Sequence, residues 1–260
     1  MTEQTHEAGR LFHLPWVGER DWLRRRRGVV RRMAVVGQTP VTERMRRVSL
    51  VLEDTEDFHW IPGQDMVLEL PLASGETARR HYTIRHFDEA EQRIDIDFVL
   101  HGDGASAPWL DQVQIGDRII AMGPRGHVTL AEGVDTHLFF GDETCIPAIA
   151  AMNARLDASA RAVALIEVRD EADEQPIESA ADLTLGWLYR RAASAGSVHL
   201  LLKAAEGLTF NPHATHAYVI GETSQVRAVR HHLLDRGLPK ARISAEGYWR
   251  PGRIGGHDHV

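Results

Sequence analysis

The sequence predicts two structural parts, an antiparallel β-barrel followed by an α/β lobe with a parallel sheet. Between residues 28 and 132, short strand-like runs are separated by turn residues such as Pro62-Gly63. Short strands with regular turn signals are typical of a small antiparallel barrel or sandwich. From residue 133 onward, apolar strand-like runs alternate with helical patterns. Strands that alternate with helices indicate a parallel sheet covered on both faces.

The first part contains clear strand patterns and one short helix. Strands are predicted at residues 47–52, 66–70, 81–85, 94–100 and 118–122. The helix is expected over residues 106–113, because Ser106 can cap it and Pro108 suits a first helical turn. Together these elements predict a barrel over residues 28–132, preceded by a loosely held lead-in at 1–27.

The second part carries the alternating pattern. Strands are predicted at 137–140, 162–168, 198–202, 217–220 and 243–248, and helices at 147–156, 183–193 and 225–236. Ligands of parallel sheets bind outside the carboxyl ends of the strands, so residues 141–144 and 221–224 should border a nucleotide crevice. The lobe is expected to span 133–252, and residues 253–260 should form a flexible tail.

Composition excludes several classes of function. The net charge of −7 argues against a nucleic-acid partner, which would require a basic face. No apolar run approaches the roughly 18 residues of a membrane span, and the N-terminus lacks the pattern of a signal peptide. The single cysteine, Cys145, is expected to be a buried small side chain in a cytoplasmic protein. The histidines lack zinc-like spacing, so no metal site is predicted.

Residues 80–85, with the sequence RHYTIR, are the most informative segment. They place a guanidinium, an aromatic ring and a hydroxyl on one strand, with Arg80, Tyr82 and Ile84 on one face and Thr83 on the other. A flavin needs a cation for its phosphates, a flat apolar surface for its ring and a hydrogen-bonding group near the ring edge. The segment therefore indicates a flavin site, and the alternative is a solvated edge strand with a packed tyrosine.

Eight segments in order resemble the ferredoxin–NADP reductase superfamily and, more narrowly, the siderophore-interacting protein family of ferric-siderophore reductases. The resemblance extends over about residues 28–252. Its segments are RHYTIR at 80–85, DFVLHG at 97–102, GASAPW at 104–109, GD at 116–117, GPRG at 123–126, GDET at 141–144, GETS at 221–224 and GYWR at 247–250.

The resemblance implies FAD as the cofactor. The residues that it implies for FAD binding are Arg80, Tyr82, Thr83, Ile84, Asp97, Val99, His101, Gly104, Ala105, Ser106 and Thr144. Tyr82 would stack on the isoalloxazine and Thr83 would hydrogen-bond near its reactive edge, so these two are the predicted catalytic residues. Arg80 would pair with the pyrophosphate, because a guanidinium fork suits phosphate oxygens.

The resemblance also implies a substrate, a ferric siderophore whose Fe(III) is reduced to the more weakly bound Fe(II). Arg125 and Arg250 are the expected substrate residues, because such chelates are often anionic. The electron donor is NADPH, NADH or ferredoxin. Arg169 could meet the 2′-phosphate of NADPH, whereas Glu167 or Asp170 could meet a ribose hydroxyl. These charges oppose one another and favour NADPH only slightly.

Two other functions remain open at this point. The chain could be a flavin-dependent oxidoreductase for another acceptor, such as free flavin, a quinone or a different iron chelate. It could also be a siderophore-binding protein without turnover, although such a protein would not need Arg80, Tyr82 and Thr83 together. Nothing in the sequence requires more than a monomer.

Overall fold

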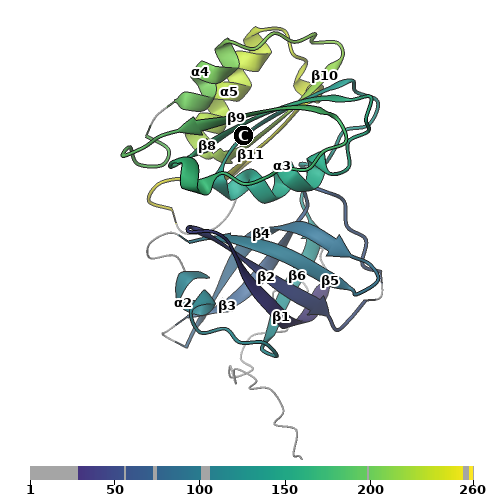
Figure 1. Cartoon of the computed structure of the whole chain (residues 1–260), viewed down its shortest axis with the longest axis vertical. Coiled ribbons are helices and arrows are strands. Elements are labelled where there is room, and N and C mark those ends of the chain that lie inside the picture. Colours follow the sequence, from purple (N-terminus) through teal and green to yellow (C-terminus); the bar gives the residue numbers. More distant parts are fainter. Residues whose placement is uncertain are drawn as a thin grey trace, which may run out of the picture.

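The computed structural model describes residues 29–55, 57–72, 75–100, 106–197, 199–253 and 258–259. These residues form a closed β-barrel and an α/β lobe stacked on it (Figure 1). The predicted fold class is confirmed, because the barrel strands pair in antiparallel fashion and the main strands of the lobe run parallel.

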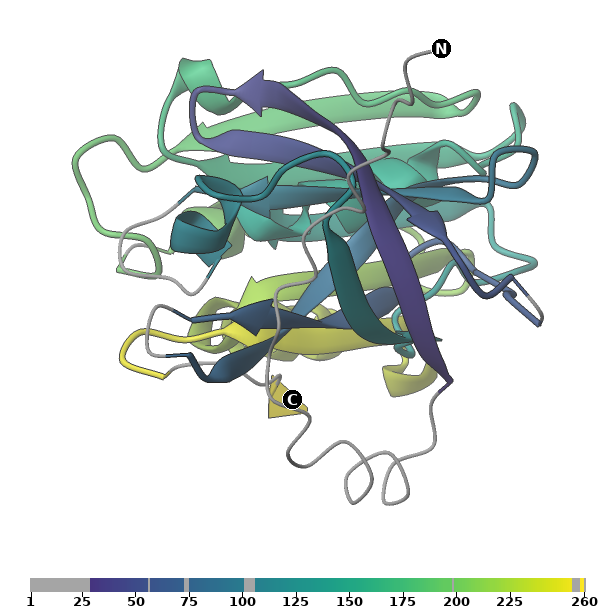
Figure 2. The same cartoon turned by 90° about the horizontal axis from the view of Figure 1, so that it is seen from below.

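The barrel closes in the strand order β1-β2-β5-β4-β3-β6 and is seen from below in Figure 2. Its strands are β1 Val30–Thr42, β2 Met45–Leu52, β3 Asp65–Pro71, β4 Thr77–Asp88, β5 Arg93–Val99 and β6 Arg118–Arg125. Alternate residues of β2, namely Val48, Leu50 and Leu52, point into the barrel core, as the period of two in a strand requires. Helix α2 (Ser106–Leu110) adds Trp109 to the same core. All five predicted strands are confirmed, and β1 is an additional one.

The lobe is built on a sheet of order β12-β11-β10-β7-β8-β9. Its strands are β7 Thr136–Asp142, β8 Arg161–Val168, β9 Asp182–Tyr189, β10 Thr215–Glu222, β11 Ile243–Trp249 and β12 Asp258–His259. Its helices are η1 Glu143–Cys145, α3 Ile146–Asn153, η2 Glu171–Asp173, α4 Leu200–Glu206, α5 Thr223–Asp235 and η3 Lys240–Arg242. Helix α3 covers the sheet face nearest the barrel, and α4 and α5 cover the opposite face (Figure 1).

Two predicted elements of the lobe were wrong. The helix expected at 183–193 is strand β9, in which Leu183, Leu185, Trp187 and Tyr189 pack on the α3 side of the sheet with a period of two. The strand expected at 198–202 is replaced by α4, which buries Leu201 and Ala205 at the i, i+4 spacing of a helix. Within the expected tail, Asp258 and His259 form β12 against β11.

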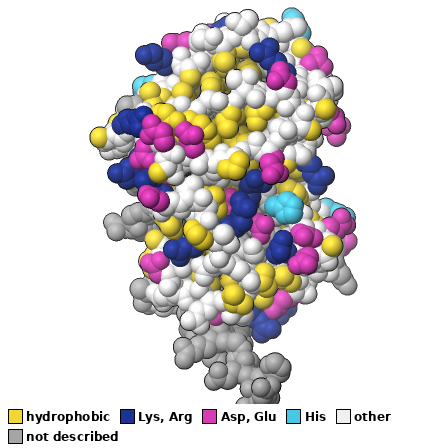
Figure 3. Space-filling model, in the orientation of Figure 1, with side chains coloured by type: hydrophobic (Ala, Val, Ile, Leu, Met, Phe, Trp, Pro, Cys, Tyr) yellow, Lys and Arg dark blue, Asp and Glu magenta, His cyan; other side chains and the backbone are white. Residues whose placement is uncertain are grey.

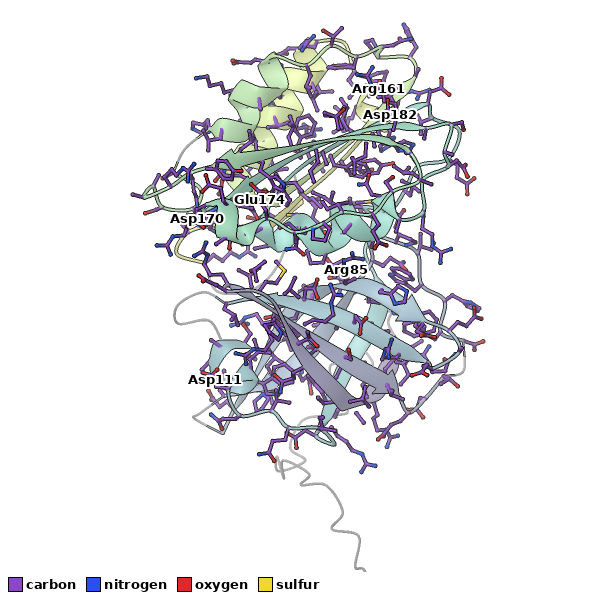
Figure 4. The ribbon with its side chains drawn as sticks, in the orientation of Figure 1. Arg85, Asp111, Arg161, Asp170, Glu174 and Asp182 are labelled. Atoms are coloured by element: carbon purple, nitrogen blue, oxygen red, sulfur yellow. The ribbon has the colours of Figure 1, made fainter. Side chains whose placement is uncertain are left out.

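Apolar packing and ion pairs fix the lobe to the barrel. Met45 and Val128 of the first part share a buried cluster with Ile149 of α3. At the turn between β1 and β2, Arg44 pairs with Asp173, with Nε 2.8 Å from Oδ1, and also with Asp170. The outer face of β4 therefore lies against the lobe, and Arg85 is seen between β4 and α3 in Figure 4. Within the described residues, no helix is long and apolar enough to cross a bilayer.

Candidate functional site

The wall of the barrel opens between β4 and β5. These strands pair from Asp88–Arg93 as far as Ile84–Ile96, where the pairing ends. Residues 80–83 of β4 continue to pair with β3 on their other side, and residues 97–99 of β5 continue to pair with β2. Backbone amide and carbonyl groups thus face the opening without pairing to one another. Such groups need partners, so the opening is suited to a polar ligand.

Tyr82 lies half-buried at this opening. Its ring packs on Phe98 of β5 with the ring centroids 4.2 Å apart, and Phe98 in turn contacts Trp109 at 5.4 Å. The Tyr82 hydroxyl hydrogen-bonds to the side chain of Ser106. Burial raises the pKa of Tyr82, although the hydrogen bond and the charge of Arg80 oppose this shift. The ring is therefore a neutral, firmly held surface.

Arg80 provides a positive charge beside the ring. Its Nη1 donates to the carbonyl oxygen of Arg79 at 2.8 Å, and no described carboxylate forms an ion pair with it. Its charge acts on the Tyr82 hydroxyl, which places the guanidinium near the opening. Three of the residues expected to bind the cofactor, Arg80, Tyr82 and Ser106, thus lie together at the opening, with a cation that remains available for an anionic ligand.

Several other predicted residues use their side chains to hold the fold. Ile84 is fully buried in the barrel core. The Asp97 carboxylate accepts two hydrogen bonds from Arg47, at 2.6 and 2.8 Å. Any contact of Ile84 or Asp97 with a cofactor is therefore left to their backbone groups. Residues 101–105, which include the predicted His101, Gly104 and Ala105, lie outside the described residues.

A second polar group of side chains lies on the outer face of β4. Thr83 is buried, and its hydroxyl hydrogen-bonds to Tyr248 of β11 across the junction of barrel and lobe. His81 on the same face approaches Asp65 of β3, with Nδ1 2.5 Å from Oδ2. Arg125 of β6 lies next to them, with Nε 3.9 Å from Asp65 Oδ1. Basic side chains are visible at the level of this junction in Figure 3.

Sequence reasoning did not identify His81, Asp65 or Tyr248 as site residues. The alternation of β4 already placed His81 on the face of Thr83. Asp65 joins them because it pairs directly with Thr83 in the register of β3 and β4. The position of Tyr248 depends on how the lobe docks on the barrel, which no local pattern contains.

Asp142 organises the carboxyl edge of the lobe's sheet. Its Oδ1 accepts hydrogen bonds from the Thr144 amide at 2.9 Å and the Thr144 hydroxyl at 2.5 Å. Its Oδ2 accepts from the Glu222 amide at 2.9 Å and from Trp249 Nε1 at 2.8 Å. Gly221, with φ of +127°, leaves room for this carboxylate, since a Cβ there would lie 2.6 Å from Oδ2. The polar groups of the predicted Thr144 are therefore directed inward, toward Asp142.

A cavity of about 270 Å³ lies between barrel and lobe, beside this edge. Val99 and Arg44 line it from the barrel, and Arg169 and Arg190 from the lobe. Arg190 is itself paired with Glu143, which it contacts at 2.8 and 2.5 Å.

The residues predicted to meet the donor's ribose or its phosphate differ in their access to this cavity. Glu167 is buried, and the Asp170 carboxylate is paired with Arg44. Arg169 lines the cavity with an exposed side chain.

The two predicted substrate arginines are both solvent-accessible, and each makes a long ion pair with a described carboxylate. Arg250 follows β11, with its Nε 3.7 Å from Asp258 Oδ2. Arg125 makes the 3.9 Å contact with Asp65 already described. Exposed ion pairs of such length contribute little to stability, so both guanidinium groups can turn to another anion.

Comparison with known proteins places this arrangement in a family. The family described as siderophore-interacting FAD-binding domain matches residues 71–128, and that described as siderophore-interacting protein matches residues 134–252. A solved siderophore utilization protein from T. fusca is 31% identical with a TM-score of 0.81, covering 88% of this chain and 95% of that one. The ferric vibriobactin reductase ViuB of Vibrio cholerae is 29% identical over 82% of this chain and 86% of its own. The NADPH-dependent ferric-chelate reductase of Escherichia coli is 25% identical over 74% of this chain and 75% of its own.

Proposed function

This chain belongs to the siderophore-interacting protein family, and on that premise we propose that it is an FAD-dependent ferric-siderophore reductase. It reduces chelated Fe(III) to Fe(II), which oxygen ligands hold more weakly, and thereby releases the iron. The observation that carries the proposal is the opening between β4 and β5, where Arg80, Tyr82 and Ser106 meet.

The residues at the opening fit FAD. Arg80 has no described carboxylate partner and is suited to the pyrophosphate, while the Tyr82 ring offers a flat surface fixed by Phe98. Tyr82 and Thr83 point to opposite faces of β4, so a ring that touches both must lie across the unpaired edge of this strand. When bound, the flavin supplies the conversion between a two-electron donor and a one-electron acceptor.

The experiment for this assignment is FAD binding by Tyr82→Ala and Tyr82→Phe. Stacking of an aromatic base on an aromatic side chain is worth about 1–3 kcal/mol, so Tyr82→Ala should weaken FAD binding by roughly 5- to 150-fold. Tyr82→Phe keeps the ring and should lose much less. Equal affinity for FAD in wild type and Tyr82→Ala, measured by titration of the apoprotein, would remove Tyr82 from the site.

The chelate is proposed to bind at Arg125 and Arg250. Both guanidinium groups are accessible, and their present ion pairs are long. Arg250→Ala should raise KM for an anionic ferric chelate more than for a neutral one. Equal increases for the two chelates would show that Arg250 acts only on the structure.

NADPH is proposed as the electron donor, with Arg169 at its 2′-phosphate. Support comes from the cavity that Arg169 lines, and a related reductase is named as NADPH-dependent. The Thr144 amide already donates a hydrogen bond to Asp142, so the dinucleotide must bind without a hydrogen bond from this amide. Arg169→Ala should raise KM for NADPH and leave KM for NADH unchanged. Flavin that neither nucleotide reduces would instead indicate ferredoxin.

A further inference from the structure

We propose that His81, held by Asp65, donates the proton that frees a ligand oxygen of the chelate once its iron is reduced, a role that rests on the proposed function. Catecholate, hydroxamate and carboxylate chelators bind iron through oxygen anions. Reduction weakens the iron–oxygen bonds, and protonation of the oxygen prevents the iron from being recaptured. A reductase that releases iron therefore benefits from an acid beside the chelate.

The geometry places an oriented histidine near both proposed sites. His81 lies two residues from Thr83 on the same face of β4, and the carboxylate of Asp65 joins them from β3. The side chains of His81 and Asp65 are only 16% and 8% exposed, so their 2.5 Å contact is largely shielded from water. A carboxylate that accepts from Nδ1–H keeps that proton in place, so the proton that the imidazolium form can transfer is the one on Nε2.

The charged surroundings connect this pair to the chelate. Asp65 Oδ1 is buried and accepts no hydrogen bond from any described residue, and Arg125 Nε lies 3.9 Å away. On the lobe side Tyr248 faces the pair, and its pKa is raised mainly by burial and in smaller part by Cys145, Glu246 and Asp65. Along β3 and β4, the next charged pair is Glu69 with Arg79. Arg125, the proposed chelate residue, thus forms an ion pair with the carboxylate that holds His81.

The proposed step balances in electrons and protons. One electron from the reduced cofactor converts Fe(III) to Fe(II). The proton on His81 Nε2 then passes to a ligand oxygen as the iron–oxygen bond breaks, which leaves a neutral O–H group and a neutral imidazole. Water restores the proton, because part of the His81 side chain is solvent-exposed. No further oxidant or reductant is needed.

The test compares two acceptors in the FAD-loaded protein. Ferricyanide takes an electron without releasing a ligand, whereas iron released from a ferric catecholate is trapped as Fe(II) by ferrozine. General acid catalysis typically contributes 10²–10⁴-fold, so His81→Gln should lower iron release relative to ferricyanide reduction by about 100-fold. Asp65→Asn should lower the same ratio, because a neutral amide does not stabilise the imidazolium as the carboxylate does.

His86→Gln is the matched control. His86 lies on the same strand and its Nδ1 is 4.0 Å from Asp95 Oδ2, but its side chain is 55% exposed. This variant should keep the wild-type ratio of the two rates. Replacement of H₂O by D₂O should slow iron release in wild type and have less effect in His81→Gln.

Binding of a redox-inert Ga(III) catecholate, followed by tryptophan fluorescence, supplies a readout that does not depend on turnover. A Kd within about twofold of wild type in His81→Gln would place the loss in the proton step. A Kd weakened as much as the rate would make His81 only a binding residue and overturn the proposal. Wild-type iron release in His81→Gln would also overturn it, while leaving the reductase function intact. A wild-type protein that reduces ferricyanide but releases no iron would instead refute the proposed function.

Discussion

Replacing Glu167 with glutamine should remove one contribution to the pH dependence of the protein's stability. Glu167 lies at the end of β8 and is 1% exposed. Its Oε1 accepts a long hydrogen bond of 3.4 Å from Gln225, and its Oε2 accepts none from the described residues. Burial, aided by the charge of Asp142, raises the pKa of Glu167 from 4.5 to about 7.

The sign of the effect follows from proton binding. Between pH 4.5 and pH 7, the folded chain keeps a proton on Glu167 that the unfolded chain has released. The stabilising contribution is therefore fully present below pH 4.5 and is lost as the pH rises through 7. Each pKa unit corresponds to 1.36 kcal/mol, so the shift is worth about 3 kcal/mol over the whole window.

Urea unfolding of the apoprotein at pH 5 and pH 8 measures this contribution. Between these values, the free energy of unfolding of Glu167→Gln relative to wild type should increase by about 2–3 kcal/mol. Contributions from other groups are common to both proteins and cancel. Glu132→Gln, at an exposed glutamate, should show no such change. A Glu167→Gln difference that is the same at both pH values would refute the assignment of a buried, protonated Glu167.

Three further predictions concern stability. Burial lowers the pKa of His216 from 6.5 to about 4. Its neutral form therefore favours folding above pH 6.5, and this stabilisation, about 3 kcal/mol at most, is lost as the pH falls to 4. His216→Asn should reduce the change in the free energy of unfolding with pH over this range, measured by urea titration. Arg47→Ala leaves the buried Asp97 carboxylate without its partner and should cost about 3–5 kcal/mol in urea unfolding; a loss below 1 kcal/mol would contradict this role. Gly221→Ala should lower Tm, because a Cβ would lie 2.6 Å from Asp142 Oδ2; an unchanged Tm would show that the turn relaxes freely.

Local patterns predicted most of the fold because the barrel strands β2 to β6 and the lobe strands β7, β8, β10 and β11 each combine a clear apolar run with flanking turn residues. Strand β9 was mistaken for a helix because half-buried Leu188 lies on its other face and obscures the period of two. The apolar run at 198–202 overlaps the start of α4 and resembles a strand, because its helical spacing is evident only when Leu201 and Ala205 are taken together on one buried face.

The sequence placed Arg80 and Tyr82 on one face of one strand and Ser106 at the start of a helix, but the contact between Tyr82 and Ser106 and the side chains around them depend on tertiary structure. The Asp97 carboxylate pairs with Arg47 because the two residues are directly opposite each other in the register of β2 and β5. Thr144 hydrogen-bonds to Asp142 because Asp142 is the N-cap residue of η1, the short helix that contains Thr144. The contact of Thr83 with Tyr248 exists only after the lobe has docked on the barrel.

The central claim is tested most directly by an anaerobic visible spectrum of the FAD-reconstituted protein, recorded through successive additions of NADPH and of a ferric siderophore with ferrozine. A ferric-siderophore reductase should show a flavin spectrum that NADPH bleaches, followed by reoxidation as two Fe(II) ions are trapped for each flavin. A protein that cannot bind FAD, or a reduced flavin that the ferric siderophore does not reoxidise, would contradict the proposed function.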